Sequence, residues 1–170
     1  MNKEEALEFL RQHQPMPPDS ELTEDLSTRY NEIREYCIAH PDRECIPLFL
    51  NSFGEGDGFG VYVLVDEVIR QFSAEEVIPH LIKALHSEHP SVREWCAQIA
   101  IDFPFPELID PLRELLQNPN EKQDTRCYAA SDLGLIDDKR ATVLLEQAFH
   151  KETDPQVWVA INDVLAGKQP

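Results

Sequence analysis

The sequence predicts an all-α fold, an α-solenoid of about four helical hairpins behind an N-terminal helical cap. Prolines recur 32 residues apart, at Pro47, Pro79 and Pro111. Each begins a segment with apolar residues at helical spacing. Two later segments share a helix start with an arginine in the first turn, Arg93 and Arg126. Because self-similarity at a fixed period is the signature of repeat architectures, stacked hairpins are expected.

The N-terminal residues 1–44 have no counterpart in the periodic part of the chain. A short helix over 3–13 is expected to end at a group of prolines, which cannot continue a helix. Asp19 or Ser20 is the candidate N-cap of the next helix. Residues 1–44 are therefore expected to cap the stack and residues 45–170 to form the repeats, all within one compact domain.

Each repeat is expected to contribute two helices. The recurring proline lies in the first turn of the first helix, where its missing N–H costs little. These first helices are expected over the ranges 45–53, 77–85, 110–117 and 141–150. The second helices are predicted from apolar residues spaced 3, 1, 3, 1, 3 along the chain, as in a helix buried along one side. These apolar sets begin at Val61, Val92, Thr125 and Val157.

Three short stretches carry a family resemblance: Pro90-Ser91-Val92-Arg93, Arg126-Cys127-Tyr128-Ala129-Ala130 with Leu133-Gly134, and Asp154-Pro155-Gln156-Val157. They resemble the short HEAT-like repeats of the bacterial phycobilin-lyase type. The resemblance covers residues 45–166, although the first repeat lacks the arginine and Trp158 replaces it in the last. It implies helical hairpins. It also implies several function classes, because such repeats occur in scaffolds, chromophore lyases, toxin-blocking immunity proteins and, in a basic form, a DNA alkyl-base glycosylase family.

The charge is the most unusual feature of the composition. Fifteen Lys and Arg residues against thirty-two Asp and Glu residues give a formal net charge of −17. Residues 1–76 alone hold seventeen acids and six bases. An acidic surface repels phosphate backbones and attracts basic proteins by long-range steering, although acidity also serves solubility alone. The charge therefore disfavours nucleic acid and favours a basic protein partner.

A glycine-rich acidic loop is the sharpest local anomaly. Residues 53–60 read Phe-Gly-Glu-Gly-Asp-Gly-Phe-Gly. No Gly-Lys-Ser/Thr follows, and the acids would repel phosphate, so this is no phosphate-binding loop. It is either a flexible connector or a mobile acidic finger that binds a partner. In the second interpretation Glu55 and Asp57 supply charge, and Phe53 and Phe59 act as anchors.

A second candidate surface is a column of equivalent positions on the second helices. Tyr62, Arg93, Arg126 and Trp158 each follow the apolar residue that opens the helix. Tyr, Trp and Arg dominate interface energetics. In HEAT-like stacks the second helices usually line the concave face, so one ridge is expected there. The alternative is that both arginines pair with acids of neighbouring repeats. The polar members of the ridge are Asp66, Glu67, Gln98, Ser131, Asn162 and Asp163.

Asp132 occupies a position that is apolar in the other repeats, which have Val68, Ile99 and Val164 there. A carboxylate in a core must be hydrogen-bonded or paired. Arg126 of the same repeat and a loop amide are the expected partners. A structural role is favoured over a catalytic one.

Metal, cofactor and membrane functions are not expected. Neither the Cys37-His40-Cys45 group nor the loop histidines His86 and His89 supply four ligands at a familiar spacing. The four cysteines lack a paired spacing and are expected as reduced thiols. No apolar run approaches a membrane span, and the N-terminus lacks the pattern of a secretory signal. A cytoplasmic location is therefore expected.

These patterns together predict a non-enzymatic protein-protein interaction module, since no catalytic constellation stands out. The most specific hypothesis is an acidic inhibitor or immunity protein that neutralises a basic partner such as a nuclease toxin. One alternative is a phycobilin-lyase-like enzyme that handles a chromophore, which requires an apolar pocket on the concave face. The other is a general HEAT-repeat scaffold. The oligomeric state is left open.

Overall fold

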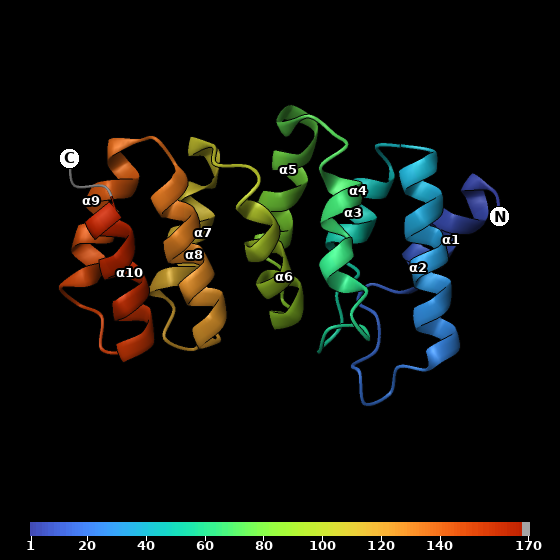
Figure 1. Cartoon of the computed structure of the whole chain (residues 1–170), viewed down its shortest axis with the longest axis horizontal. Helices are drawn as coiled ribbons and strands as arrows, with labels where there is room; N and C mark the ends of the chain where they lie inside the picture. Colours follow the sequence, from blue (N-terminus) through green and yellow to red (C-terminus); the bar gives the residue numbers. More distant parts are fainter. Residues whose placement is uncertain (168–170) are drawn as a thin grey trace. The chain divides into compact units, whose positions relative to one another are not determined.

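The computed structural model describes residues 1–167, and within that range it contains helices and loops but no strand (Figure 1). The prediction of an all-α solenoid of helical hairpins is confirmed. No helix of the described residues is long and apolar enough to cross a membrane.

The helices divide into two compact units, and the boundary between Trp95 and Cys96 falls inside α6 (Pro90–Ala100). The first unit contains α1 to α5 and the N-terminal half of α6. The second contains the rest of α6 and α7 to α10. The predicted boundary between a cap and the repeats after residue 44 stays a prediction.

The first unit opens with two helices, α1 (Lys3–Gln12) and α2 (Glu24–Ala39). Thr23 caps α2, because its hydroxyl accepts a hydrogen bond from the N–H of Leu26. The prediction that Asp19 or Ser20 caps this helix is therefore wrong. Residues 18–22 form a turn in which Pro18 O accepts from two N–H groups, so the chain enters α2 later than expected.

The first helix of each predicted repeat is present. The third helix, α3 (Cys45–Leu50), is shorter than expected, and α5 (Ala74–Leu85) begins earlier, because Ser73 and Glu76 form a capping box ahead of its apolar face. The other two, α7 (Ile109–Gln117) and α9 (Lys139–Phe149), lie close to their predicted ranges.

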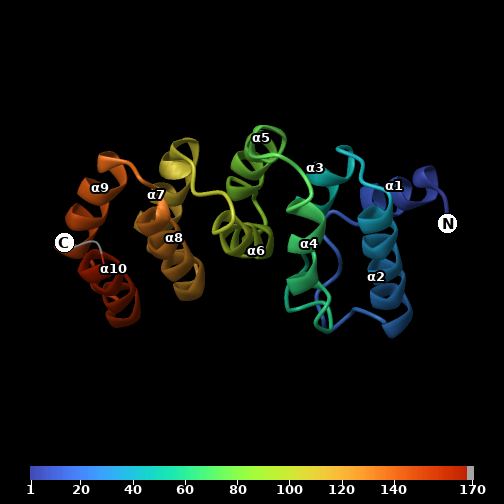
Figure 2. The same ribbon diagram turned by 45° about the horizontal axis from the view of Figure 1, so that its top comes forward.

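The second helices follow the prediction in three repeats out of four. In the second unit α7 and α8 (Gln123–Leu135) form one hairpin, α9 and α10 (Pro155–Gly167) form the next, and α10 packs against α8 (Figures 1 and 2). The prediction of a regular second helix beginning at Val61 is wrong. The structure has a 3-10 turn, η1 (Tyr62–Leu64), and the single-turn helix α4 (Asp66–Ile69).

An aromatic cluster lies in the core of the first unit. The ring of Tyr62 makes edge-on contacts with Tyr30 and Phe53, at centroid distances of 5.7 and 5.5 Å. The half-buried ring of Trp95 stacks on Phe53 at 5.7 Å. The Tyr30 hydroxyl shares a 2.6 Å hydrogen bond with that of Ser52. Offset and edge-on aromatic pairs add to the energy of burial. The cluster therefore ties the glycine-rich loop to α2 and α6.

Candidate protein-binding site

The glycine-rich loop is a hydrogen-bonded turn, which we call the acidic turn (residues 54–60). One carboxylate, that of Asp19, accepts from the N–H groups of Asp57 and Gly58, both at 3.0 Å. The N–H of Asp19 in turn donates to Glu55 O at 2.8 Å. These three bonds bind the acidic turn to the connector that precedes α2.

Further contacts hold the acidic turn from the helices. The Ser27 hydroxyl donates to Gly58 O at 3.0 Å, and the Trp95 indole donates to Gly56 O at 3.1 Å. The N–H of Gly54 donates to the Tyr62 hydroxyl at 3.2 Å. Burial raises the pKa of Tyr62 to about 12, so its hydroxyl is neutral at physiological pH. The sequence predicted a flexible connector or a mobile finger, whereas the structure shows a turn with partners on several sides.

Close approach explains two of the glycines. A Cβ at Gly54 would lie 2.5 Å from Met16 O and 2.6 Å from Pro17 O. Gly58 has a φ of 63°, and a Cβ there would meet the ring of Tyr62 at 2.6 Å. All three distances are shorter than a Cβ atom tolerates. The glycines therefore permit tight packing of the turn, and they do not by themselves indicate mobility.

Phe59 is the conformational outlier of the acidic turn. Its φ of +57° lies in the left-handed region, which a bulky residue rarely adopts. Its side chain is 52% exposed, and the exposed side chains of Glu55 and Asp57 precede it in the turn. Backbone strain of this kind persists where the surrounding structure enforces it, and it is frequent at functional sites. The acidic turn thus presents an aromatic ring to solvent among carboxylates.

Two more apolar side chains are exposed directly after the acidic turn. Val63 is 57% exposed and Leu64 is 36% exposed. The sequence predicted that Leu64 is buried and Tyr62 exposed, whereas in the structure Tyr62 is buried and Leu64 is exposed. The apolar phase differs because the 3-10 turn η1 replaces the α-helix from which the prediction was made. The expectation that Tyr62 lies on an exposed ridge is therefore wrong.

The other ridge residues of the first unit form hydrogen bonds or ion pairs within that unit. Arg34, on α2, donates to the Glu67 carboxylate at 2.7 Å. Asp66 forms a 2.7 Å ion pair with Arg70, one turn away on the chain. The guanidinium of Arg93 donates to Ser87 O at 2.7 Å. The structure therefore confirms neither Asp66 nor Arg93 as a free binding group, while Glu67 keeps an exposed side chain.

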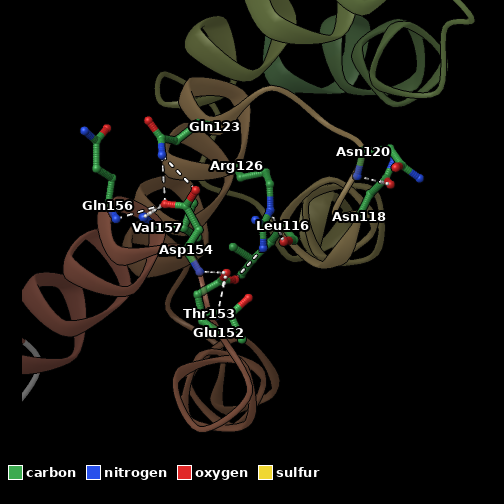
Figure 3. A network of polar contacts seen from close by, with 10 residues as sticks. All are labelled: Leu116, Asn118, Asn120, Gln123, Arg126, Glu152, Thr153, Asp154, Gln156 and Val157. Atoms are coloured by element: carbon green, nitrogen blue, oxygen red, sulfur yellow. Dashed lines mark hydrogen bonds and ion pairs between the residues drawn. The ribbon is translucent and has the colours of Figure 1, made fainter.

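In the second unit Arg126 is a buried structural residue. Its Nε donates to Leu116 O at 2.9 Å, and its guanidinium pairs with the Glu152 carboxylate (Figure 3). Glu152 also accepts from the N–H groups of Thr153 and Asp154, at 3.0 and 2.8 Å. The arginine therefore links α7 and α8 to the loop before α10. The expectation of an exposed Arg126 is wrong, and the alternative of an ion pair between repeats is confirmed for this residue.

Asp154 completes the same network by capping α10. Its carboxylate accepts from the N–H groups of Gln156 and Val157, at 2.9 and 3.1 Å, and from the side chain of Gln123 at 2.8 Å (Figure 3). These bonds lower the pKa of Asp154, the bond from Gln123 most of all. A pocket of about 330 Å³ lies beside the network, with Lys151 among its lining residues.

The remaining ridge residues of the second unit differ in exposure. Trp158 is partly exposed, and its ring packs on Phe149 at a centroid distance of 4.8 Å. Asp163 is exposed, and Gln98 is half-buried. The predicted column is thus divided between the two units, with Tyr62 and Arg93 in the first. Because Tyr62 and Arg126 are buried, the four column residues do not form one exposed ridge.

Asp132 is buried, and its Oδ2 atom has no hydrogen-bond partner among the described residues. Burial raises the pKa of Asp132 to about 8, and the nearby carboxyl of Asp102 adds to the shift. The prediction that Asp132 pairs with Arg126 is wrong, because the Arg126 guanidinium pairs with Glu152 instead. Within the described residues no group of three or more His, Cys, Asp and Glu side chains is arranged to hold a metal ion.

Three residues of the site could not be assigned from the sequence. Asp19 was expected as a helix cap, and nothing local indicates that it binds amides 38 residues away. Val63 and Leu64 were read as part of a regular helix. The signal that could have indicated an irregular backbone before Val63 and Leu64 was the run of glycines at alternate positions. Several of these glycines adopt positive φ, which a regular helix does not allow.

Replacement of Asp19 with alanine tests what holds the acidic turn. We expect Asp19→Ala to lower the free energy of unfolding by about 1–3 kcal/mol, because two N–H groups lose a charged acceptor. Amide exchange at Asp57 and Gly58 should accelerate. Glu21→Ala, an exposed residue with the same charge change, is the matched control for urea unfolding. Equal effects of the two variants would contradict the assigned role of Asp19.

The chain was compared with known protein families. A family model of HEAT repeats matches residues 78–165, which is more than half of the chain. The matched range runs from within α5 to within α10. No curated protein matches the sequence.

Proposed function

The chain belongs to the HEAT-repeat family, and we propose that it is a non-enzymatic binding module whose acidic turn contacts a basic protein. HEAT repeats indicate a protein-interaction scaffold. The further step, from scaffold to the sign of the partner's charge, depends on the first unit. We infer from its exposed residues that Glu55, Asp57 and Phe59 form the centre of the binding surface.

The observation that carries the proposal is the exposed ring of Phe59 at positive φ on a hydrogen-bonded turn. A large aromatic residue whose backbone is already held in a hydrogen-bonded turn loses less conformational freedom on binding than one in a mobile loop. Aromatic residues are also enriched among the residues that dominate interface energy. The flanking carboxylates supply charge for a basic partner, in agreement with the net charge of −17.

A nuclease toxin is the most specific partner of this kind. The active surface of a nuclease is basic, because it binds the phosphate backbone. An inhibitor with exposed carboxylates competes for those cationic groups. The same charge speeds association, which an immunity protein needs in order to act before the toxin cleaves nucleic acid. We therefore propose an acidic inhibitor or immunity protein as the finer function.

Photocrosslinking from the acidic turn identifies the partner. A benzophenone amino acid in place of Phe59 should crosslink a basic protein in the source cell. The same group in place of Val143, an exposed residue of α9, is the control position. The purified partner is then measured against the wild-type chain by surface plasmon resonance at two ionic strengths.

Charge changes in the acidic turn should slow association. We expect the double variant Glu55→Lys/Asp57→Asn to lower the association rate by about 10-fold or more at low salt. Asparagine retains the side-chain oxygen that accepts from the N–H of Gly60 in the native turn. Phe59→Ala should instead raise the dissociation rate, because the loss of a buried anchor residue shortens the lifetime of a complex more than it slows its formation.

The matched control is Glu146→Lys/Glu107→Gln, which makes the same charge change at exposed sites of the second unit. Association that is insensitive to salt and equal in both double variants would contradict the proposed surface. A crosslinked acidic protein would contradict the partner's charge. Salt-independent binding of a tetrapyrrole, with no basic partner, would favour the chromophore-lyase alternative.

A further inference from the structure

Two buried thiols face each other where α2 meets α3. Cys37 lies in the last turns of α2, and Cys45 is the first residue of α3. Their Sγ atoms are 3.1 Å apart, and one thiol donates a hydrogen bond to the other. Of the other two cysteines, Cys96 is buried and Cys127 is partly buried. The first unit thus holds one preformed dithiol.

A cavity makes this dithiol accessible to small molecules. It has a volume of about 190 Å³, and both cysteines line it. Lys3 and Asp42 also line it and form a 2.5 Å ion pair whose side chains are partly exposed. Buried thiols are ordinarily inert because reagents do not reach them. Here the volume of the cavity exceeds that of a hydrogen peroxide molecule, so a small oxidant can reach the two cysteines.

The two sulfur atoms differ in their chemistry. The hydrogen bond from Cys37 lowers the pKa of the Cys45 thiol, whereas the same bond and burial raise the pKa of Cys37. Burial also raises the pKa of Cys96 and of Cys127. Since the thiolate is the nucleophile, Cys45 is the sulfur that reacts first. Cys37 is then in place as the resolving thiol.

We propose that Cys37 and Cys45 form a modification site, which a peroxide oxidises to a disulfide. The Cys45 thiolate attacks one peroxide oxygen, the O–O bond breaks, and the departing oxygen takes a proton to leave as water. The sulfenic acid at Cys45 is then attacked by the Cys37 sulfur, which loses its proton, and a second water leaves. Two thiols and one hydrogen peroxide thus give one disulfide and two waters.

The geometry favours bond formation over further oxidation of one sulfur. An S–S bond is about 2.05 Å long, so the sulfur atoms need to approach by about 1 Å. The resolving thiol is already in contact with the atom on which the sulfenic acid forms. The disulfide would tie the last helix of the predicted cap to the first helix of the predicted repeats. It should therefore raise the stability of the first unit.

Oxidation of the full chain with hydrogen peroxide tests the proposal. The intact mass should fall by about 2 Da, and Cys37 and Cys45 alone should escape alkylation by iodoacetamide. Dithiothreitol should reverse both changes. The unfolding temperature should rise by several degrees in the oxidised protein. Cys96→Ala/Cys127→Ser, which leaves the dithiol intact, should behave as wild type.

Cys37→Ser and Cys45→Ser separate the two roles. Without Cys37, Cys45 should be oxidised past the sulfenic acid, with a gain of about 32 Da for the sulfinic acid. Without Cys45, Cys37 should stay reduced under the same treatment. Circular dichroism checks that both variants are folded. A wild-type protein that gains oxygen at Cys45, or that retains four alkylatable thiols after peroxide treatment, would overturn the proposal.

Discussion

Asp132→Val is expected to stabilise the second unit at pH 8 by about 2–5 kcal/mol, because it removes a buried carboxyl whose Oδ2 atom lacks a hydrogen bond. Valine occupies the equivalent positions of two other repeats, at Val68 and Val164. The side chain of Asp132 is 4% exposed, so solvent does little to offset the cost of its charge. The effect should be measured by urea unfolding.

The pH dependence of the wild type follows from the same residue. The carboxyl ionises near pH 4 in the unfolded chain, whereas its pKa is raised to about 8 in the folded protein. Between these values the folded state binds the extra proton. The free energy of unfolding should therefore fall as pH rises from about 4 to 8, by up to about 1.4 kcal/mol per pH unit. It should be highest at the acidic end of this window.

Two asparagine variants isolate this effect. Asp132→Asn keeps the shape of the side chain but does not titrate, so its stability should depend much less on pH between 5 and 8. Asp163→Asn, on an exposed position of α10, should retain the wild-type profile. A wild-type protein that is equally stable at pH 5 and pH 8 would show that Asp132 does not bear this charge cost.

Arg126→Ala should destabilise the second unit by about 3–5 kcal/mol. The substitution leaves the Glu152 carboxylate buried without its cation and removes the donor to Leu116 O. Arg29→Ala is the control, because Arg29 and Glu32 form an ion pair of 2.9 Å at an exposed site. Exposed pairs contribute up to about 1 kcal/mol, so this variant should change stability little.

A double-mutant cycle separates the ion pair from the packing of the arginine. The double variant Arg126→Met/Glu152→Gln removes both charges. Its loss in the free energy of unfolding should be smaller than the sum of the losses caused by Arg126→Met and Glu152→Gln alone. If Arg126→Ala and Arg29→Ala have equal effects in thermal unfolding, the network of Figure 3 contributes no more than a surface pair.

The repeating part of the fold could be predicted from the sequence because its causes are local. Proline in a first turn and apolar residues at helical spacing act within one helix. Helices α7 and α9 accordingly lie within two residues of their predicted ends. The same reasoning placed Asp132 in the core, because the equivalent positions of the other repeats are apolar.

The prediction was least successful where a contact joins distant parts of the chain. The acidic turn depends on Asp19, 38 residues before Asp57, and this contact decides that the glycines form a fixed turn. Arg126 binds Glu152, 26 residues further on, and so leaves Asp132 without the partner that proximity suggested. A periodic pattern identifies which faces are buried. It contains no information on which buried polar groups find each other.

The sequence by itself therefore determined the class of the fold, the positions of most helices and the excess of acidic charge, since these depend on residue type and spacing. The tertiary structure alone decided that Tyr62 is buried, that Phe59 is exposed at positive φ, and that Cys37 and Cys45 meet. The first two outcomes follow from packing around an irregular segment, where a shift of one residue in backbone phase exchanges a buried side chain for an exposed one. The third depends on the contact between α2 and α3, which joins residues of two regular helices.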